Sequence, residues 1–207
     1  SQGIDRERCI QINTHDRSVL RFLAERVAEL STRPIEEKKK QLWFKHNALE
    51  ATRPLVFCDP ENGWNEIITS DQLQCHGELA RGWEMSLRKE IFWAESMGDD
   101  RVTERYFNVP YTYTITDWGM HETRIGGIGG GAYRWDAPLT DYADFDKLRY
   151  PEISIDYSTT EKMVNLAKEI LGDLLEVRLK GVWWWTLGMT RTLVDLRGLT
   201  QIMLDMY

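Results

Sequence analysis

Hydrophobic positions along this chain recur first at helical spacing. From Asp16 to about Leu49 they predict two helices, because one apolar stripe repeats every three or four residues. The second helix is expected to begin after Thr32, a candidate cap that precedes Pro34. The residues of the first stripe are Val19, Leu20, Leu23, Ala24, Val27 and Leu30.

Beyond these helices, apolar runs predict strands that alternate with further helices. A short run at residues 53–58 is typical of a buried parallel strand, since it is brief, apolar and bounded by Asp59 and Pro60. The later predicted elements are a helix at 70–97, a strand at 106–118, a non-periodic loop at 121–151, a helix at 163–174, a strand at 177–187 and a helix at 190–207. This alternation predicts a parallel sheet with helical crossovers.

The pattern divides the chain into an N-terminal helical segment, residues 1–52, and an α/β part, residues 53–207. The last predicted helix stays apolar to Met206 without a Gly or Pro stop signal. Three parallel strands would also expose an apolar sheet edge. We therefore expect the rest of the sheet either to be missing from this chain or to be supplied by another chain.

Composition and charge narrow the classes of partner. The 207 residues carry a formal net charge of −7, which argues against nucleic acid or anionic membranes as the main partner. The three cysteines, Cys9, Cys58 and Cys75, lack metal-ligand spacing and favour a reducing compartment. The sequence shows neither a membrane-length apolar run nor a signal-peptide pattern, so a cytoplasmic location is expected.

Several phrases together resemble the uroporphyrinogen decarboxylase-like superfamily, which includes corrinoid-dependent methyltransferases. Their order and spacing carry the resemblance, since none is specific alone. The phrases lie at residues 43–49 (WFKHNAL), 52–56 (TRPLV), 59–66 (DPENGWNE), 169–173 (EILGD) and 197–201 (RGLTQ). The resemblance implies a partial (β/α)8 TIM-type barrel of about three strands, preceded by the N-terminal helical segment.

The chain departs from the decarboxylases at one informative place. True uroporphyrinogen decarboxylases look arginine-rich just after the first predicted strand, as a multiply carboxylated porphyrin requires. Here residues 59–66 are acidic and aromatic instead, which disfavours a polyanionic substrate. The methyltransferase branch is therefore the better match. Its zinc-dependent members carry a His and Cys ligand set later in the barrel, so zinc stays open, and a corrinoid is expected on a partner protein rather than on this segment.

Candidate site residues come from the ends of the predicted strands, where barrel enzymes place their active sites. In the first group, Glu66 is a candidate catalytic residue, and Asp59 and Trp64 are candidate substrate-binding residues. A carboxylate beside an indole suits a cationic or methylated group, or gives a carboxylic acid with a raised pKa. The alternative is that Asp59 caps a turn and Trp64 packs against a helix.

A second group follows the next predicted strand. His121 is a candidate acid, base or metal ligand, Glu122 a candidate catalytic carboxylate, and Trp118 a candidate pocket wall. Adjacent residues point in different directions, so His121 and Glu122 do not form a chelate by spacing alone. No metal ligand is assigned, and His15, His46 and His76 are given no role.

Two further features lie on later segments. The glycines at 126–131 lack the context of a phosphate-binding loop and favour a flap or a plain flexible loop. In the Trp183–Trp185 run, alternation sends the middle indole to the opposite face, and Trp185, nearest the strand end, is the candidate pocket residue.

The leading hypothesis is a barrel enzyme that transfers a methyl group between a small methylated substrate and a corrinoid protein. Two alternatives stay open: a decarboxylase or other lyase on the same barrel, and a non-catalytic half-barrel that completes a partner. The missing barrel half or a second copy of the chain is accordingly an expected partner.

Overall fold

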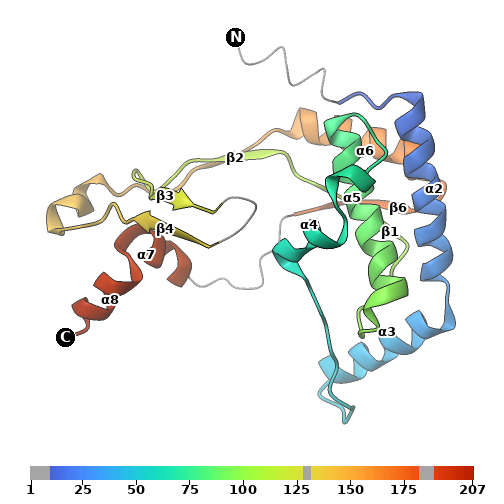
Figure 1. Ribbon diagram of the computed structural model, residues 1–207, viewed down its shortest axis with the longest axis horizontal. Helices are drawn as coiled ribbons and strands as arrows, with labels where there is room; N and C mark the ends of the chain where they lie inside the picture. Colours follow the sequence, from blue (N-terminus) through green and yellow to red (C-terminus); the bar gives the residue numbers. More distant parts are fainter. Residues whose placement is uncertain (1–9, 128–131, 182–188) are drawn as a thin grey trace. The chain divides into compact units, whose positions relative to one another are not determined.

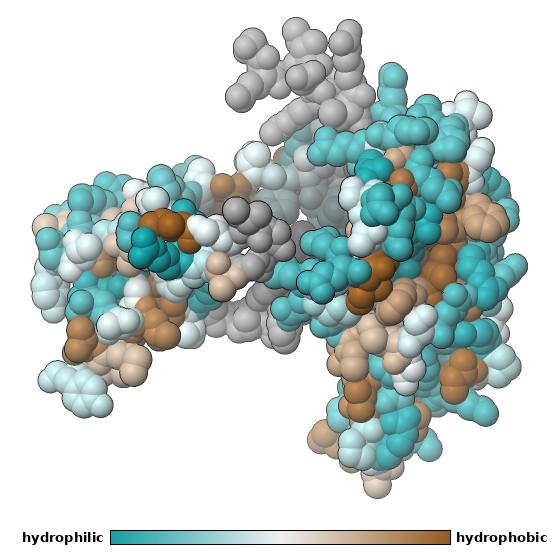
Figure 2. All heavy atoms as spheres, viewed as in Figure 1, coloured by the Kyte–Doolittle hydropathy of each residue, from teal (hydrophilic) through white to brown (hydrophobic). Residues whose placement is uncertain are grey.

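The computed structural model describes residues 10–127, 132–181 and 189–207 and shows a mixed α/β chain (Figure 1). The chain forms two units. Unit 1 comprises Ser1–Pro110 and Ser158–Lys180, and unit 2 comprises Tyr111–Tyr157 and Gly181–Tyr207. Hydrophobic and hydrophilic residues lie intermingled on the face of each unit that Figure 2 shows. No helix among the described residues is long and apolar enough to cross a membrane.

Helices build unit 1 together with one parallel pair of strands. The helices are α2 (Thr14–Ser31), α3 (Pro34–Asn47), α5 (Glu78–Phe92) with its π-helical extension η3 (Trp93–Met97), and α6 (Tyr157–Leu171). Asn13 caps α2 by accepting a hydrogen bond from the backbone N–H of Asp16 at 2.8 Å. The predicted stripe of α2 is confirmed, because Leu20, Ala24 and Val27 are fully buried in a core shared with α5 and α6.

The segment between α3 and α5 holds three short helical turns. They are η1 (Glu61–Gly63), α4 (Trp64–Ile67) and η2 (Ser70–Gln72). The helix predicted at 70–97 therefore begins later, at Glu78, and ends as predicted at Met97. Gly98 follows with φ of +69°, a conformation that ends the helix without strain because glycine has no Cβ.

Two strands of unit 1 form a parallel pair. β1 (Tyr106–Pro110) lies beside β6 (Glu176–Lys180), with Tyr106 opposite Glu176 and Pro110 opposite Lys180. Helix α6 belongs to the connection between them, so the predicted parallel pairing with a helical crossover is confirmed for these two strands. Phe107 and Val109 face the core at 5% and 0% exposure.

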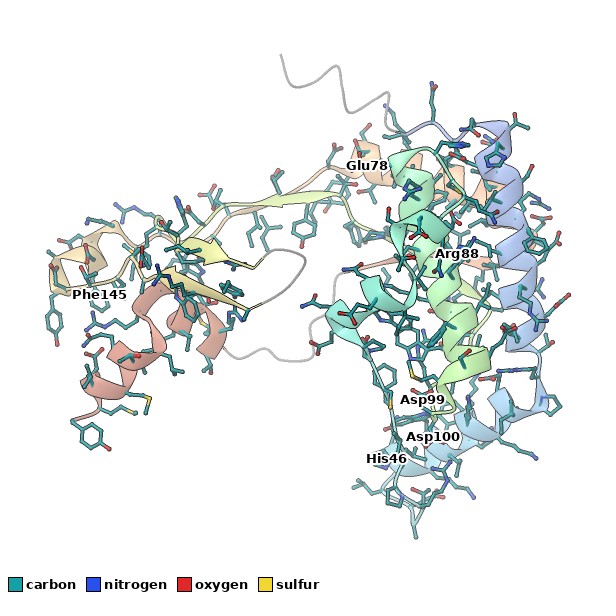
Figure 3. The ribbon with its side chains drawn as sticks, in the orientation of Figure 1. His46, Glu78, Arg88, Asp99, Asp100 and Phe145 are labelled. Carbon is teal, nitrogen blue, oxygen red and sulfur yellow. The ribbon has the colours of Figure 1, made fainter. Side chains whose placement is uncertain are left out.

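The strand predicted at 53–58 is wrong, because residues 51–60 are neither helix nor strand. Carboxylates take the place of a neighbouring strand. The backbone N–H groups of Val56 and Cys58 donate to Asp100 and Asp99 at 2.8 and 2.9 Å, and Asp100 N–H donates to the Val56 carbonyl at 2.8 Å. Figure 3 labels this pair of aspartates. Among the described residues, the parallel sheet thus has two strands where about three were predicted.

Asp100 makes the attachment of this segment sensitive to acid. The Arg53 guanidinium, then the Val56 N–H, lower the pKa of Asp100 to about 2 against some opposition from burial. The folded-state pKa lies below the unfolded value of about 3.9, so the stabilisation is complete above about pH 4 and is lost as the pH falls toward about 2.

We expect Asp100→Asn to have a lower urea midpoint than the wild type at neutral pH. Between about pH 5 and about pH 2.5 the midpoint of the variant should decrease less with falling pH than that of the wild type. Asp146→Asn, at an exposed aspartate of unit 2, serves as the control. Urea titrations at a series of pH values measure the effect. If the urea midpoint of Asp100→Asn fell with decreasing pH as steeply as that of the wild type, Asp100 would not be the source of the acid sensitivity.

Unit 2 consists of short strands and short helices. β2 (Tyr113–Ile115) pairs antiparallel with β5 (Ile153–Ile155), and β3 (Thr123–Gly126) pairs antiparallel with β4 (Tyr133–Asp136). The helical elements are η5 (Tyr142–Lys147), α7 (Thr190–Arg197) and α8 (Leu199–Asp205). The predicted loop at 121–151 therefore contains a hairpin and a helical turn.

Two predicted elements are divided in the structure. The strand predicted at 106–118 becomes β1 and β2, which have different partners. The helix predicted at 190–207 is interrupted at Gly198, where φ is +80°. Of the strand predicted at 177–187, residues 182–188 lie outside the described residues.

Polar contacts join the two segments of unit 2. Leu139 N–H donates to the Leu196 carbonyl at 2.9 Å, and the Trp135 indole N–H donates to the Asp195 carbonyl at 3.1 Å. Arg197 donates to the carbonyls of Leu139 and Thr140 at 3.0 and 2.6 Å. The segments before α6 and after β6 thus form one unit.

Candidate functional site

Asp59 and Trp64, two of the candidate substrate-binding residues, are brought together in unit 1. Asp59 Oδ1 accepts hydrogen bonds from the backbone N–H of Glu61 and from the indole Nε1–H of Trp64, each at 3.0 Å. Glu61 adopts φ of +50° in this turn. These contacts fit the alternative interpretation, in which Asp59 caps a turn.

The indole of Trp64 lies in a small aromatic core. Only 3% of the residue is exposed, and its ring meets Trp93 and Phe92 edge-on at centroid distances of 4.5 and 5.8 Å. The Lys89 ammonium lies 5.4 Å from the ring centroid. A cation of the protein itself therefore occupies the position that a cationic ligand would take, and Trp64 packs as the alternative interpretation expects.

Glu66, the candidate catalytic carboxylate of unit 1, is exposed on α4. It lies on the same short helix as Trp64, but points to solvent while the indole is buried. Its role as a catalytic residue stays a prediction.

The turn at residues 117–122 carries the candidates of unit 2. His121 Nδ1 lies 3.2 Å from Asp117 Oδ2, and the two side chains are 77% and 51% exposed. Asp117 also accepts the Gly119 N–H at 2.9 Å through Oδ1. This arrangement orients the imidazole by a carboxylate, as general acid–base histidines require, in a position that solvent reaches.

Glu122 has a different partner from its neighbour. Its Oε1 lies 2.6 Å from Arg124 Nη2. Burial acts to raise the pKa of Glu122, but a backbone hydrogen bond and the Arg124 guanidinium outweigh burial and hold the pKa below its usual value. Glu122 is therefore ionised at neutral pH and suits an electrostatic role rather than proton donation.

Trp118 lines a small hollow within unit 2. Its ring lies 6.1 Å from that of Tyr150, and Leu148 and Arg149 complete a space of about 310 Å³. The Arg149 N–H donates to the Trp118 carbonyl at 2.8 Å. Gly119, with φ of +82°, passes so close to the Lys147 carbonyl that a Cβ would collide with it. The half-buried indole thus has an apolar surface that a ligand can reach.

Trp185, the remaining candidate, lies outside the described residues. The candidates therefore fall into two sets, Asp59, Trp64 and Glu66 on unit 1, and Trp118, His121 and Glu122 on unit 2. The first set lies within residues 59–66 and the second within residues 118–122.

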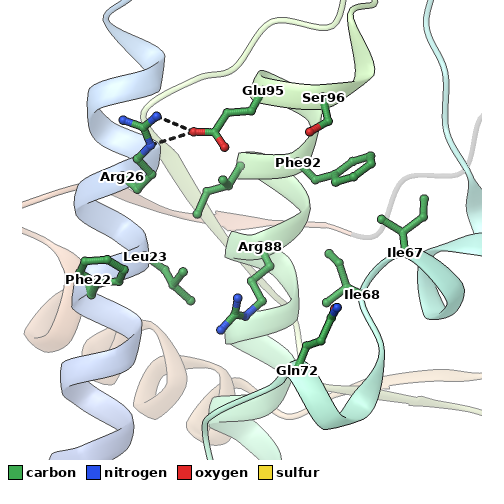
Figure 4. A pocket seen from close by; sticks show the side chains of 11 residues that line it. Phe22, Leu23, Arg26, Ile67, Ile68, Gln72, Arg88, Phe92, Glu95 and Ser96 are labelled. Atoms are coloured by element: carbon green, nitrogen blue, oxygen red, sulfur yellow. Dashed lines mark hydrogen bonds and ion pairs between the residues drawn. The ribbon is translucent and has the colours of Figure 1, made fainter.

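A groove of about 420 Å³ in unit 1 was not predicted from the sequence (Figure 4). Its apolar lining includes Phe22, which is 71% exposed, together with Ile68 and Phe92. At one end Arg26 Nε donates to Glu95 Oε1 at 2.9 Å. The helical stripes predicted which residues are buried between helices, but not where neighbouring helices leave a gap.

The sequence pattern also gave no role to three residues that the structure gathers at the start of α2. His15, Asp16 and His76 each offer a ligand atom, and these atoms lie within 4.8 Å of one another. Because residues 15–16 and 76 are far apart in sequence, no spacing motif could have revealed the group.

Comparisons of this chain with models of protein families, with curated proteins and with solved structures give no match.

Proposed function

We propose that this chain forms part of a (β/α)8 barrel enzyme of the uroporphyrinogen decarboxylase-like superfamily. The proposed reaction transfers a methyl group between a small methylated substrate and a corrinoid carried by a partner protein. The resemblance of the sequence phrases supports the superfamily, and the parallel β1–β6 pair supports the barrel.

One topological observation carries the proposal. The chain enters unit 2 at Tyr111, directly after the carboxyl end of β1, and again at Gly181, directly after the carboxyl end of β6. In barrels and other parallel α/β folds, active sites are built from the segments that follow the strands. Unit 2 consists of those segments and carries Trp118, His121 and Glu122.

The open face of the parallel pair also fits a barrel. By alternation, Tyr106, Asn108, Arg178 and Lys180 point away from the face that Phe107 and Val109 bury. Parallel sheets are normally covered on both faces, so further chain is expected to cover this polar face in the complete barrel. The free outer edges of β1 and β6 in the described part of the chain leave room for further strands.

In the proposed reaction, His121 protonates the heteroatom that loses the methyl group, and Asp117 orients the imidazole. Glu122, held ionised by Arg124, stabilises the imidazolium or a cationic methylated group. Trp118 forms an apolar wall of the site, with Trp185 as a second proposed wall. The corrinoid would supply the methyl-accepting metal centre. Glu66, which belongs to unit 1, stays a separate predicted proton donor.

The basic residues on β6 favour one second candidate. Arg178 stacks on Tyr106, with its guanidinium carbon 3.2 Å from the ring centroid, and Lys180 lies two residues further along the same face. Arg178 is already paired with Glu176 on the same face, with its Nε 2.8 Å from Glu176 Oε1. The second candidate therefore rests on Lys180, whose charge suits a carboxylated substrate such as a decarboxylase or another lyase would bind. The half-barrel that completes a partner stays an alternative on sequence grounds alone.

The test is methyl transfer from a panel of methylated amines and aryl ethers to cob(I)alamin, monitored by absorbance, with the complete protein. We expect His121→Ala to lower kcat/KM by about a hundredfold or more, and Glu122→Gln to lower it less. His46→Ala, at an exposed histidine of α3, is the matched control.

The outcomes separate the candidates. Full activity in both Glu66→Gln and His121→Ala would contradict the site assignment. If no methylated donor supported transfer and a carboxylated substrate released CO₂, the lyase would be favoured over the methyltransferase.

A further inference from the structure

A pair of exposed histidines flanks a fully buried carboxylate at the N-terminal end of α2. His15 and Asp16 come from the first turn of α2, and His76 comes from the loop just before α5. The two imidazole rings lie 4.9 Å apart, tilted by 37°. Asp16 is 0% exposed, while the His76 side chain is 75% exposed. The group thus combines one buried carboxylate with two exposed imidazoles.

Backbone hydrogen bonds hold the carboxylate in place. Asp16 Oδ1 accepts the His76 N–H and Asp16 Oδ2 accepts the Gly77 N–H, each at 2.9 Å. Each oxygen has a remaining lone pair, because a carboxylate offers about four acceptor sites. His76 Nδ1 lies 3.6 Å from Asp16 Oδ1. Two ligands bound to one zinc ion at about 2.0–2.2 Å in tetrahedral geometry are about 3.3 Å apart, so this pair is near coordination distance.

The hydrogen bond of His15 selects its metal-binding form. His15 Nε2 lies 3.2 Å from the Gln74 carbonyl oxygen, which can only accept a hydrogen bond. Nε2 therefore carries the hydrogen, and Nδ1 keeps the lone pair that can bind a metal ion. Histidines that bind metals commonly donate their other ring N–H to a backbone carbonyl in this way.

We propose that His15, Asp16 and His76 bind a divalent transition-metal ion, with zinc as the fitting choice. Two imidazoles and one carboxylate are a donor set that zinc accepts, with water completing the coordination. The ligand atoms lie within 4.8 Å of one another, and the exposed His76 imidazole can rotate toward the ion while His15 keeps its hydrogen bond to the Gln74 carbonyl. The ion joins the start of α2 to the loop that leads into α5.

The zinc site shares no residue with the set proposed for methyl transfer. Its ligands are His15, Asp16 and His76, whereas the residues proposed for proton transfer are Glu66, His121 and Glu122. Neither cysteine that the structure describes contributes a ligand: Cys58 is not in the group, and the Cys75 thiol is buried, with its pKa raised to about 12 by burial and by Glu84.

The test is isothermal titration of the complete protein with ZnCl₂, in a Cys9→Ser/Cys58→Ser background that removes other thiol sites. We expect one zinc ion per chain. His15→Ala and His76→Ala should each weaken zinc binding by about tenfold or more, because each removes one of three protein ligands. His46→Ala should bind zinc as the parent does, since His46 is an exposed histidine of the same unit outside the group.

Melting temperatures without and with zinc give the second readout. Both exposed histidines can be replaced without a core cavity, so the variants should melt like the parent in EDTA and lose only the rise that zinc causes in the parent. Absence of zinc binding in the parent, or unchanged affinity in His15→Ala and His76→Ala, would overturn the proposal. Neither result depends on methyl transfer, because no substrate or corrinoid is present.

Discussion

Glu84→Ala is expected to lower the free energy of unfolding of unit 1 by about 3–5 kcal/mol, because it removes a buried carboxylate that accepts two backbone N–H groups and pairs with the half-buried Arg88. Glu84 is 0% exposed. Its carboxylate accepts the N–H groups of Gln74 and Cys75 at 2.9 and 2.7 Å and pairs with Arg88 Nε at 2.8 Å. Without it, these donors and the guanidinium would be left without their acceptor.

Equilibrium urea unfolding measures this loss, with Glu78→Ala as the matched control. Glu78 is an exposed glutamate in the first turn of the same helix (Figure 3). Its loss removes only a favourable charge at a helix N-terminus, worth about 0.3–1 kcal/mol. A loss of less than about 1 kcal/mol in Glu84→Ala would mean that the Glu84 carboxylate does not anchor the loop before α5.

Trp64→Ala is expected to cost about 3–5 kcal/mol of stability, as truncation of a large buried aromatic side chain usually does. The indole contacts Trp93 and Phe92, and its N–H donates to Asp59. Trp64→Phe keeps an apolar ring but loses the N–H donor, so it should cost less than the alanine variant. Differential scanning calorimetry or urea unfolding distinguishes the two variants.

Trp118→Ala provides the comparison for Trp64, because Trp118 is only half-buried, in unit 2. We expect it to leave the unfolding of unit 1 nearly unchanged and to affect methyl transfer instead. If Trp64→Ala kept full stability and lost substrate binding, the packing role of Trp64 would be wrong and its predicted ligand contact would be favoured.

Helices were predicted from the sequence more successfully than strands, for a local reason. The stripe from Leu20 to Leu30 lies on a single element, so its periodicity alone indicates the buried face. The run at 53–58 is also apolar, but its backbone donors are satisfied by Asp99 and Asp100, about forty residues later. An apolar run therefore did not reveal whether a strand or a pair of carboxylates would satisfy its backbone.

The candidate site shows the same limit. Asp59 and Trp64 were expected to lie close together, because only four residues of a turn separate them, but the indole is buried in a core rather than facing a ligand. His121 and Glu122 are adjacent in sequence and yet take different partners, Asp117 and Arg124. The contact of His15 with His76 depends on how α2 packs against α5, which no local pattern specifies.

The alternation of the chain between its two units has a consequence for folding. Unit 2 is assembled from segments on either side of α6 and β6, which start at Tyr111 and Gly181. The residues just before these starting points, Pro110 and Lys180, are partners in the β1–β6 register. Pairing of β1 with β6 brings the ends of the intervening chain together. Most of the conformational entropy that is lost when the two segments of unit 2 approach one another is therefore already lost before unit 2 forms. Unit 2 should therefore fold after the parallel pair and open before it, which makes its amides the earlier ones to exchange with deuterium.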